Sequence, residues 1–451
     1  MNPASRIALR LSLTRRIPAA AALLAVLLAV PAGSPPAQGA SASVRDYPMF
    51  NLDPMRSGVN TAERILTPGT VGKLTKLWST QLTGVADESV IELSGVGPKR
   101  APNLLFTTTR QGITYALNAA NGAVVWTFNP HDGNLPSYRI TTATPAADPS
   151  RAWIYAASPD GRIHKLAAAT GKEASGWPVT VTLHPQDEKL ASALNVVAGN
   201  VLETTSGYIG DFGQYDGHVV AINTQSRKLL VFNSLCSDYQ GLFAESAASG
   251  KTCPHVQSGM WARSGAVVDL MNGSPTKGSI FAVTGNGNYN GSTNWGDTVL
   301  RLALGGSGLA LKDAYTPTNF DQLDSQDLDL GSTAPIILPR QPGAHPWLEV
   351  QGGKDGYLRV IDRTDMSGRG RPGHPGGEVS RFSIPQGGHM PTAGLAWKDG
   401  SGVTWVFYST DNGVAGIQVR MVNGTATLRQ VWLHEGTYSS PLLAGGVLYV
   451  A

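Results

Sequence analysis

The sequence predicts an all-β fold, a β-propeller of seven to eight four-stranded blades, and three observations support this. The chain of 451 residues is rich in glycine (53) and proline (29), and only 15% of its residues are charged, which is typical of turn-rich β proteins. A strand–turn–strand pattern recurs along the chain. A short run of small residues precedes most of the repeats.

Each repeat contains an apolar strand, a tight turn that ends in glycine, an alternating strand and an outer strand that often carries an aromatic residue. Asp-Gly and Asn-Gly turns supply the positive φ angles that tight hairpins need. Alternating apolar residues allow a strand to bury its faces between neighbouring blades. The turn glycines lie 49 to 79 residues apart, and they are Gly112, Gly161, Gly217, Gly296, Gly356 and Gly413.

The runs of small residues predict the inner strands, because strands crowd around the narrow axis of a propeller. These runs are residues 144–146, 191–193, 264–266, 334–336, 393–395 and 440–442. A single repeat cannot bury both of its faces. We therefore expect one closed domain over residues 43–451.

The two ends of this domain bear on how the ring closes. Residues 77–79 (Leu-Trp-Ser) have the pattern of an outer strand with no blade before it. Residues 438–451 have the pattern of inner strands with no outer strands after them. Either the early strand closes a seven-bladed ring directly, or the sequence is incomplete at its C-terminus, and we expect the second.

The first 42 residues have the pattern of a secretory signal peptide. Four arginines precede an unbroken apolar run at residues 19–30, and Ala-x-Ala follows at 40–42. We therefore expect a secreted or periplasmic protein, with twin-arginine export left open by Arg15 and Arg16. No later segment is apolar enough to predict a membrane span. Without the four arginines the chain is near neutral, which argues against nucleic-acid binding.

The chain has two cysteines, Cys236 and Cys253. In an oxidising compartment they predict one disulfide across a loop, and a two-cysteine metal site is the minor alternative. No C-x-x-C-H motif is present, so covalent attachment of a c-type haem is not expected.

Some segments carry a family resemblance. Residues 352–363 are GGKDGYLRVIDR and residues 117–126 are LNAANGAVVW, and the opening segment 47–60 adds to them. They resemble the pyrroloquinoline quinone (PQQ)-like β-propellers of the quinoprotein alcohol dehydrogenase-like superfamily. The resemblance covers residues 46–451 and implies eight blades.

The same resemblance implies two kinds of function. Some members are dehydrogenases that need calcium and PQQ, and others are scaffolds that bind no quinone. In the alcohol dehydrogenases a disulfide between adjacent cysteines typically caps the quinone. Cys236 and Cys253 are not adjacent, so that element is absent from this sequence.

Six residues precede the inner strands and are expected at one mouth of the axial channel. Arg139, Trp261, Arg263 and Tyr438 would bind an anionic, planar cofactor such as PQQ. Asp329 and His389 would act as base and orienting partner in the oxidation of an alcohol. The alternative is that all six cap strand ends and pair with one another.

Two polar loops are candidate calcium sites. Residues 286–297 are NGNYNGSTNWGD, and oxygen atoms at such short spacing suit Ca²⁺, with Asn294 and Asp297 as the predicted ligands. The alternative is a long polar hairpin loop. Residues 321–329 contain four aspartates, which would form a second site or a solvated acidic loop.

Two functions follow from these observations. The first is a binding or scaffold protein of the cell envelope that recognises an envelope protein or a small molecule. The second is an oxidoreductase, a dehydrogenase that uses PQQ and Ca²⁺ to oxidise an alcohol or a sugar. Phosphate-binding loops, zinc-protease motifs and nucleophile elbows are absent from the sequence.

Overall fold

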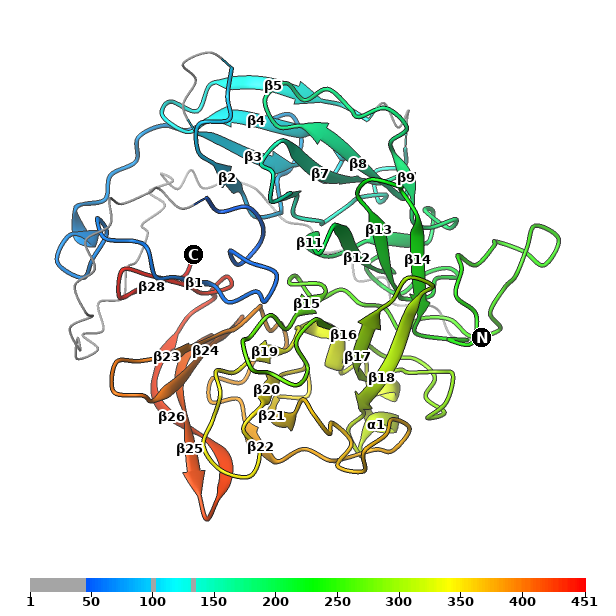
Figure 1. Cartoon of the computed structure of the whole chain (residues 1–451), viewed down its shortest axis with the longest axis vertical. Helices are drawn as coiled ribbons and strands as arrows, with labels where there is room; N and C mark the ends of the chain where they lie inside the picture. Colours follow the sequence, from blue (N-terminus) through cyan, green and yellow to red (C-terminus); the bar gives the residue numbers. More distant parts are fainter. Residues whose placement is uncertain (1–45, 99–102, 131–134) are drawn as a thin grey trace, which may run out of the picture.

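The computed structural model describes residues 46–98, 103–130 and 135–451. Seven β-sheets follow one another around a ring, as Figure 1 shows, so the chain is a β-propeller. The predicted signal peptide, residues 1–42, lies outside the described residues. Within the described part of the chain, no helix combines the length and the apolar character that crossing a membrane requires.

We number the blades 1 to 7 in the order of their sheets along the chain. Blade 1 contains β2 (Ile91–Leu93), β3 (Leu104–Thr108), β4 (Thr114–Asn118) and β5 (Val124–Phe128). Blade 2 contains β6 (Ala146–Ala147), β7 (Trp153–Ser158), β8 (Arg162–Ala167) and β9 (Val179–Thr180). Blade 3 contains β10 (Glu188–Leu190), β11 (Asn195–Val197), β12 (Asn200–Gly207), β13 (His218–Asn223) and β14 (Leu229–Asn233).

The second half of the ring continues the order. Blade 4 contains β15 (Val267–Val268), β16 (Ser279–Val283), β17 (Val299–Leu304) and β18 (Leu309–Tyr315). Blade 5 contains β19 (Ile336–Ile337), β20 (Leu348–Gln351), β21 (Tyr357–Asp362) and β22 (Ser380–Ser383). Blade 6 contains β23 (Leu395–Lys398), β24 (Thr404–Thr410), β25 (Gly413–Val422) and β26 (Thr425–Glu435). Blade 7 contains β1 (Val59–Asn60), β27 (Leu442–Ala444) and β28 (Val447–Tyr449).

Two blades depart from the expected four strands. In blade 3, both β10 and β11 pair with β12, so this sheet has five strands. Blade 7 has three described strands, and β1 joins it in parallel, with Val59 opposite Leu443. The described helices are short and lie in connections: η1 (Val71–Lys73), α1 (Phe320–Ser325) and η2 (Leu330–Ser332).

The core lies between the blades, because both faces of most inner strands are buried. In β16, Ile280 and Ala282 pack toward blade 3, whereas Phe281 and Val283 pack toward blade 5. This alternation follows from the two-residue period of a strand. The turn glycines act as predicted in several hairpins, and Gly356 has a φ of 77° between β20 and β21.

An early segment crosses the axis of the ring. The buried guanidinium of Arg56 donates to the backbone oxygens of Ser264, Ala193 and Leu194, which lie on the inner segments of blades 3 and 4. Phe50 packs between Ala193 and Ala393, from opposite sides of the ring. Residues 50–56 therefore pack against the inner segments of blades 3, 4 and 6.

The outer strand predicted at residues 77–79 is not formed: these residues belong to no sheet and lie against blade 1. The indole nitrogen of Trp78 donates to the Ala119 oxygen (3.0 Å), and its ring covers Gly122. Trp126 of blade 1 makes the equivalent contacts with blade 2: its indole nitrogen donates to the Ala168 oxygen (2.9 Å), and its ring covers Gly171. Residues 77–80 thus occupy the place of an outer strand beside blade 1.

Candidate functional site

The candidate site lies at one end of the propeller, which we call the turn face. The hairpin between the second and third strands of each blade reaches this end. The segment before each inner strand begins there too, because neighbouring strands are antiparallel. Loops held by a rigid scaffold in this way commonly carry binding residues.

One group of polar residues meets on the turn face around an indole ring, between blades 4 and 5. Trp261 precedes β15, Asp327 and Asp329 precede β19, and Lys354 lies in the turn between β20 and β21. Asn286 and Asp297 come from the connection between β16 and β17. We call these six residues the Trp261 site.

Lys354 is the centre of the Trp261 site. Its ammonium nitrogen lies 2.6 Å from an oxygen of Asp329 and 2.9 Å from an oxygen of Asp327. The same nitrogen lies 5.2 Å from the centroid of the Trp261 ring, within the range of a cation–π interaction. Burial alone would lower the pKa of Lys354, but the two aspartates outweigh it and raise this pKa. Lys354 is therefore charged at neutral pH.

The carboxylates of the site differ in their surroundings. Asp329 is buried and its other oxygen accepts a hydrogen bond from the backbone nitrogen of Asn286 (2.8 Å). Asp297 is buried as well, and one of its oxygens accepts from the backbone nitrogen of Leu330 (2.9 Å) while the other has no partner. Burial raises the pKa of Asp297 well above its ordinary value. The side chain of Asp327 is 64% exposed, so the site opens to solvent on that side.

The structure brings together only some of the residues predicted for a quinone. Trp261 and Asp329 meet through Lys354. Arg263 lies apart from them: one of its nitrogens donates to the Asp87 backbone oxygen (2.8 Å) and another pairs with the Asp87 carboxylate (3.3 Å). Asp87 also pairs with Arg110 (2.9 Å). Burial would raise the pKa of Asp87, but these two arginines hold it below its usual value.

Arg139 and Tyr438 lie at other points of the turn face. Arg139 donates to the Pro159 oxygen (3.1 Å) and lines a cavity of about 220 Å³ between blades 1 and 2, together with Gln111. The hydroxyl of Tyr438 lies 2.6 Å from the Nδ1 atom of His434 at the end of blade 6. Each of these two side chains has local partners, as the alternative interpretation expected.

The predicted catalytic pair and the predicted calcium ligands have separate surroundings. His389 is exposed before β23, whereas the Asp329 carboxylate contacts Asn286 and Lys354. The side-chain oxygen of Asn294 accepts from the backbone nitrogen of Cys236 (2.9 Å), and its amide nitrogen donates to Asn288 (2.6 Å). Asn294 therefore joins the hairpin loop to the disulfide loop, while Asp297 belongs to the Trp261 site.

The described residues contain no group of three or more His, Cys, Asp or Glu side chains arranged to hold a metal ion. The disulfide expected between Cys236 and Cys253 is formed.

Sequence reasoning missed two groups of residues. Lys354 lies within residues 352–363, the segment that carries the family resemblance, and the repeat pattern gives it no separate role. A buried cluster around His218 and Glu188, in blade 3, gave no signal because its members are far apart in the chain. Their association depends on the five-stranded sheet of that blade, which the repeat pattern did not predict.

Comparison with known proteins agrees with this fold. The family model for the β-propeller domain of PQQ-containing glucose, ethanol and alcohol dehydrogenases matches residues 59–193. No curated protein matches the sequence.

Solved structures that resemble the chain include two quinohemoprotein alcohol dehydrogenases. That of Pseudomonas putida HK5 has a TM-score of 0.62 at 14% identity, over 90% of this chain and 69% of its own. That of Comamonas testosteroni has a TM-score of 0.60 at 13% identity, over 90% and 70%. A europium-containing methanol dehydrogenase has a TM-score of 0.59 at 17% identity, over 90% and 81%.

Identities this low show a shared fold and leave the activity open. The seven sheets and the repeats show a β-propeller, its residues 59–193 match the PQQ propeller family model, and its fold is shared with the quinoprotein alcohol dehydrogenases.

Proposed function

We propose that the protein is an exported binding propeller and that its ligand lies on the Trp261 site. The observation that carries this proposal is the arrangement of Lys354, which contacts both the indole face and two aspartates. An aromatic face, a cation and carboxylates within one site offer stacking, donor and acceptor groups to a small polar ligand. Asp327 is exposed beside them and is free to contact a ligand.

Export is part of the proposal. It is supported by the signal-peptide pattern at residues 1–42 and by the disulfide between Cys236 and Cys253, since disulfides persist in oxidising compartments. Expression in a bacterial host, followed by fractionation and N-terminal sequencing, tests it. Cleavage after residue 42 with recovery outside the cytoplasm is expected, and an uncleaved cytoplasmic product would contradict it.

A PQQ- and Ca²⁺-dependent dehydrogenase is the second candidate, and a specific observation favours it. The Trp261 ring offers a flat surface on which a planar quinone would stack, and the Lys354 ammonium lies beside it. Asp297 has a buried oxygen without a partner, which would contact the Ca²⁺ ion. Bound there, the quinone would supply the acceptor for a hydride from an alcohol. Asp329 would hold the hydroxyl proton of that alcohol.

The contacts of two arginines on the turn face favour binding without redox chemistry. Arg139 and Arg263, which the sequence suggested for the carboxylates of the quinone, have partners elsewhere on the turn face. An anion with several carboxylates would therefore meet one lysine that two aspartates already neutralise.

A thermal-shift screen distinguishes the two candidates. The purified protein would be heated with a panel of sugars, alcohols and small aromatic acids, and separately with PQQ plus Ca²⁺, since a ligand that binds the folded state raises the Tm. Trp261→Leu should abolish a true response. Trp153→Leu is the matched control, because Trp153 also lies under a lysine, Lys165, at 4.8 Å.

Each outcome of the screen has a definite meaning. A response to PQQ that is lost in Trp261→Leu and kept in Trp153→Leu would establish the second candidate. A response to another compound with the same dependence would establish the first. A ligand whose effect is unchanged by Trp261→Leu would place the binding function outside this site.

A further inference from the structure

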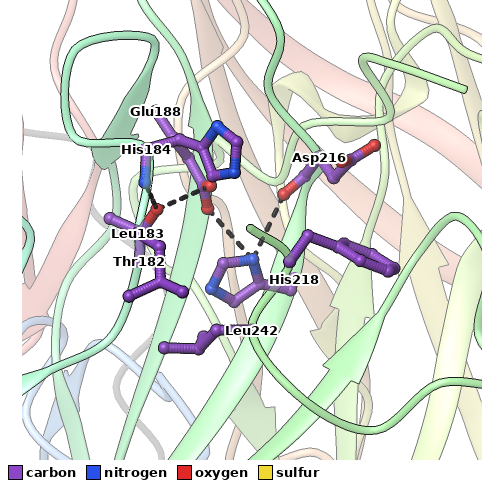
Figure 2. A pocket seen from close by; sticks show the side chains of 8 residues that line it. Thr182, Leu183, His184, Glu188, Asp216, His218 and Leu242 are labelled. Atoms are coloured by element: carbon purple, nitrogen blue, oxygen red, sulfur yellow. Dashed lines mark hydrogen bonds and ion pairs between the residues drawn. The ribbon is translucent and has the colours of Figure 1, made fainter. Parts of the chain in front are cut away.

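A second polar cluster lies in blade 3, sealed inside the protein. His218 is the first residue of β13 and Glu188 is the first residue of β10, and both side chains are almost fully buried. The Nδ1 atom of His218 lies 3.0 Å from an oxygen of Glu188 (Figure 2). The other oxygen of Glu188 accepts a hydrogen bond from the Thr182 hydroxyl (2.8 Å).

Both ring nitrogens of His218 face atoms that only accept hydrogen bonds. The Nε2 atom lies 2.8 Å from the backbone oxygen of Val181. The Nδ1 atom lies near the Glu188 carboxylate and 3.2 Å from the backbone oxygen of Asp216. A neutral imidazole has one donor and one acceptor, so it satisfies only one of these sides. The doubly protonated, cationic form of His218 therefore suits both sides of the ring better than either neutral tautomer.

The roof of this cluster comes from the disulfide loop, residues 236–253. Leu242 and Phe243 of the loop line a cavity of about 10 Å³ over His218, with room for about one water molecule. Gln186 also donates to Glu245 of the loop at the surface (2.8 Å). Leu242 and Phe243 therefore cover the cluster, and the loop packs directly over His218 and Glu188.

The other titratable groups that face His218 belong to its own connection and to the segment before β10. Asp216 has a buried carboxylate oxygen without a partner, and burial raises its pKa to about 7. His184 has a buried Nε2 atom without a partner. The disulfide loop contributes the apolar side chains of Leu242 and Phe243 to the cavity, and its Glu245 accepts from Gln186 at the surface.

We propose that the His218–Glu188 pair is a proton-operated latch that holds the disulfide loop closed while His218 is charged and releases it when His218 loses its proton. After deprotonation, one ring nitrogen presents a lone pair to an oxygen about 3 Å away, so a contact directly beneath Leu242 and Phe243 becomes repulsive. Asp216, whose pKa burial raises to about 7, adds negative charge to the cavity as it ionises, and this charge favours the protonated ring.

The titration of His218 sets the direction of the switch. Burial would lower the pKa of His218, but Glu188 and the two backbone oxygens outweigh burial and raise it above its ordinary value. The pair therefore stabilises the closed loop below about pH 6.5, and this stabilisation is lost as the pH rises through the raised pKa of His218.

A second histidine–glutamate pair provides the matched control. His164 of β8 lies 2.6 Å from Glu173 through Nδ1, and its Nε2 atom lies 2.9 Å from the hydroxyl of Ser158. A hydroxyl donates as well as accepts, so this site also accommodates a neutral ring. Burial lowers the pKa of His164 in spite of Glu173.

Hydrogen exchange measured by mass spectrometry tests the latch. Exchange rates of residues 236–253 in the full protein would be measured between about pH 6 and pH 9 and corrected for the intrinsic exchange rate. The protection of these amides should fall by about tenfold or more over this range. The midpoint of the fall should follow the titration of His218 and lie above the ordinary histidine pKa. Glu188→Gln keeps the shape of the side chain and removes its charge, so the fall should move to lower pH by about one unit. Glu173→Gln should leave the fall unchanged.

Two results would overturn the proposal. One is protection of the loop that does not change with pH in the unsubstituted protein. The other is a midpoint that moves equally, or not at all, in Glu188→Gln and Glu173→Gln. If Glu188→Gln does not fold, an NMR titration of the histidine rings of the unsubstituted protein decides, since no ring titrating above about pH 6.5 would contradict a charged His218.

Discussion

Two lysine–tryptophan pairs in this propeller look alike locally and differ in what surrounds them. Lys165 lies 4.8 Å from the ring of Trp153, within 6 Å of the rings of Tyr155 and Trp177, and donates to the Thr224 oxygen of blade 3 (2.9 Å). Lys354 contacts one ring, that of Trp261, and two aspartates. The first pair joins blades 2 and 3, and the second lies on the turn face.

The difference shows which of the two pairs has binding capacity left. Lys165 is satisfied by aromatic faces and a backbone oxygen, and burial lowers its pKa. Lys354 has two carboxylates for one ammonium, and Asp327 is largely exposed, so acceptor groups remain for a ligand. A cation–π pair therefore indicates packing in one region of this fold and a binding site in another, depending on its third partner.

The largest expected effect comes from removing the Lys354 ammonium. Lys354→Met should lower the free energy of unfolding by about 3 kcal/mol at pH 8, because it leaves the Asp329 charge buried without a partner. Burial already raises the pKa of Asp329 and will raise it further without Lys354, so the loss should be smaller at pH 5, where the carboxyl takes up a proton. Urea unfolding at both pH values measures it. An equal loss at the two values would mean that charge is not the cause.

The next effect is a rescue that isolates this charge. Adding Asp329→Asn to Lys354→Met should restore about 2 kcal/mol at pH 8, because an amide oxygen still accepts from Asn286 and carries no charge. A double-mutant cycle over the four proteins gives the coupling. Additive losses would show that Lys354 and Asp329 act independently, contrary to the ion pair described here.

The two tryptophans should separate stability from binding. Trp153→Leu should cost about 2 kcal/mol, because Trp153 packs against the core cluster between blades 2 and 3. Trp261→Leu should lower the free energy of unfolding by less than about 1 kcal/mol, because Trp261 is only partly buried. The same substitution should remove ligand binding. Thermal unfolding of both variants, with and without any ligand found in the screen, makes the comparison. Equal costs would remove the distinction between the two pairs.

The smallest effect is expected for Lys165→Met. The four-carbon stem of the side chain is largely replaced, and only a half-exposed cation–π contact and one hydrogen bond are lost, worth less than about 1 kcal/mol together. Urea unfolding beside Lys354→Met gives the ratio of the two. A loss as large as that of Lys354→Met would show that the rings around Lys165 matter as much as carboxylates.

The fold was predictable from the sequence because its signals are local. A hairpin glycine such as Gly356 and the alternation in β16 each report on neighbouring residues, and together they predict a propeller. The outer strand predicted at residues 77–79 did not form, although Trp78 packs against blade 1 as an outer-strand aromatic would. The fifth strand of blade 3 was not predicted, because β10 pairs with the far end of β12 and has no repeat counterpart.

The site was only partly predictable, because it depends on which loops meet. The positions of Trp261 and Asp329 before inner strands predicted that they share one mouth of the channel, and in the structure both contact Lys354. The sequence did not show that Lys354 would join them or that Arg263 would instead pair with Asp87. Loop length and direction decide these contacts, and a repeat pattern does not encode either.

Arg56 has a consequence for how the chain is made. Three of its hydrogen bonds reach backbone oxygens 137, 138 and 208 residues further along the chain, and β1 pairs with β27 near residue 443. This early segment leaves the ribosome first, but the partners of Arg56 are complete only when residue 264 has been made, and β1 pairs with β27 only after six blades have been synthesised. Closure of the ring is therefore a late, long-range step, and the early segment must stay free of other partners until then.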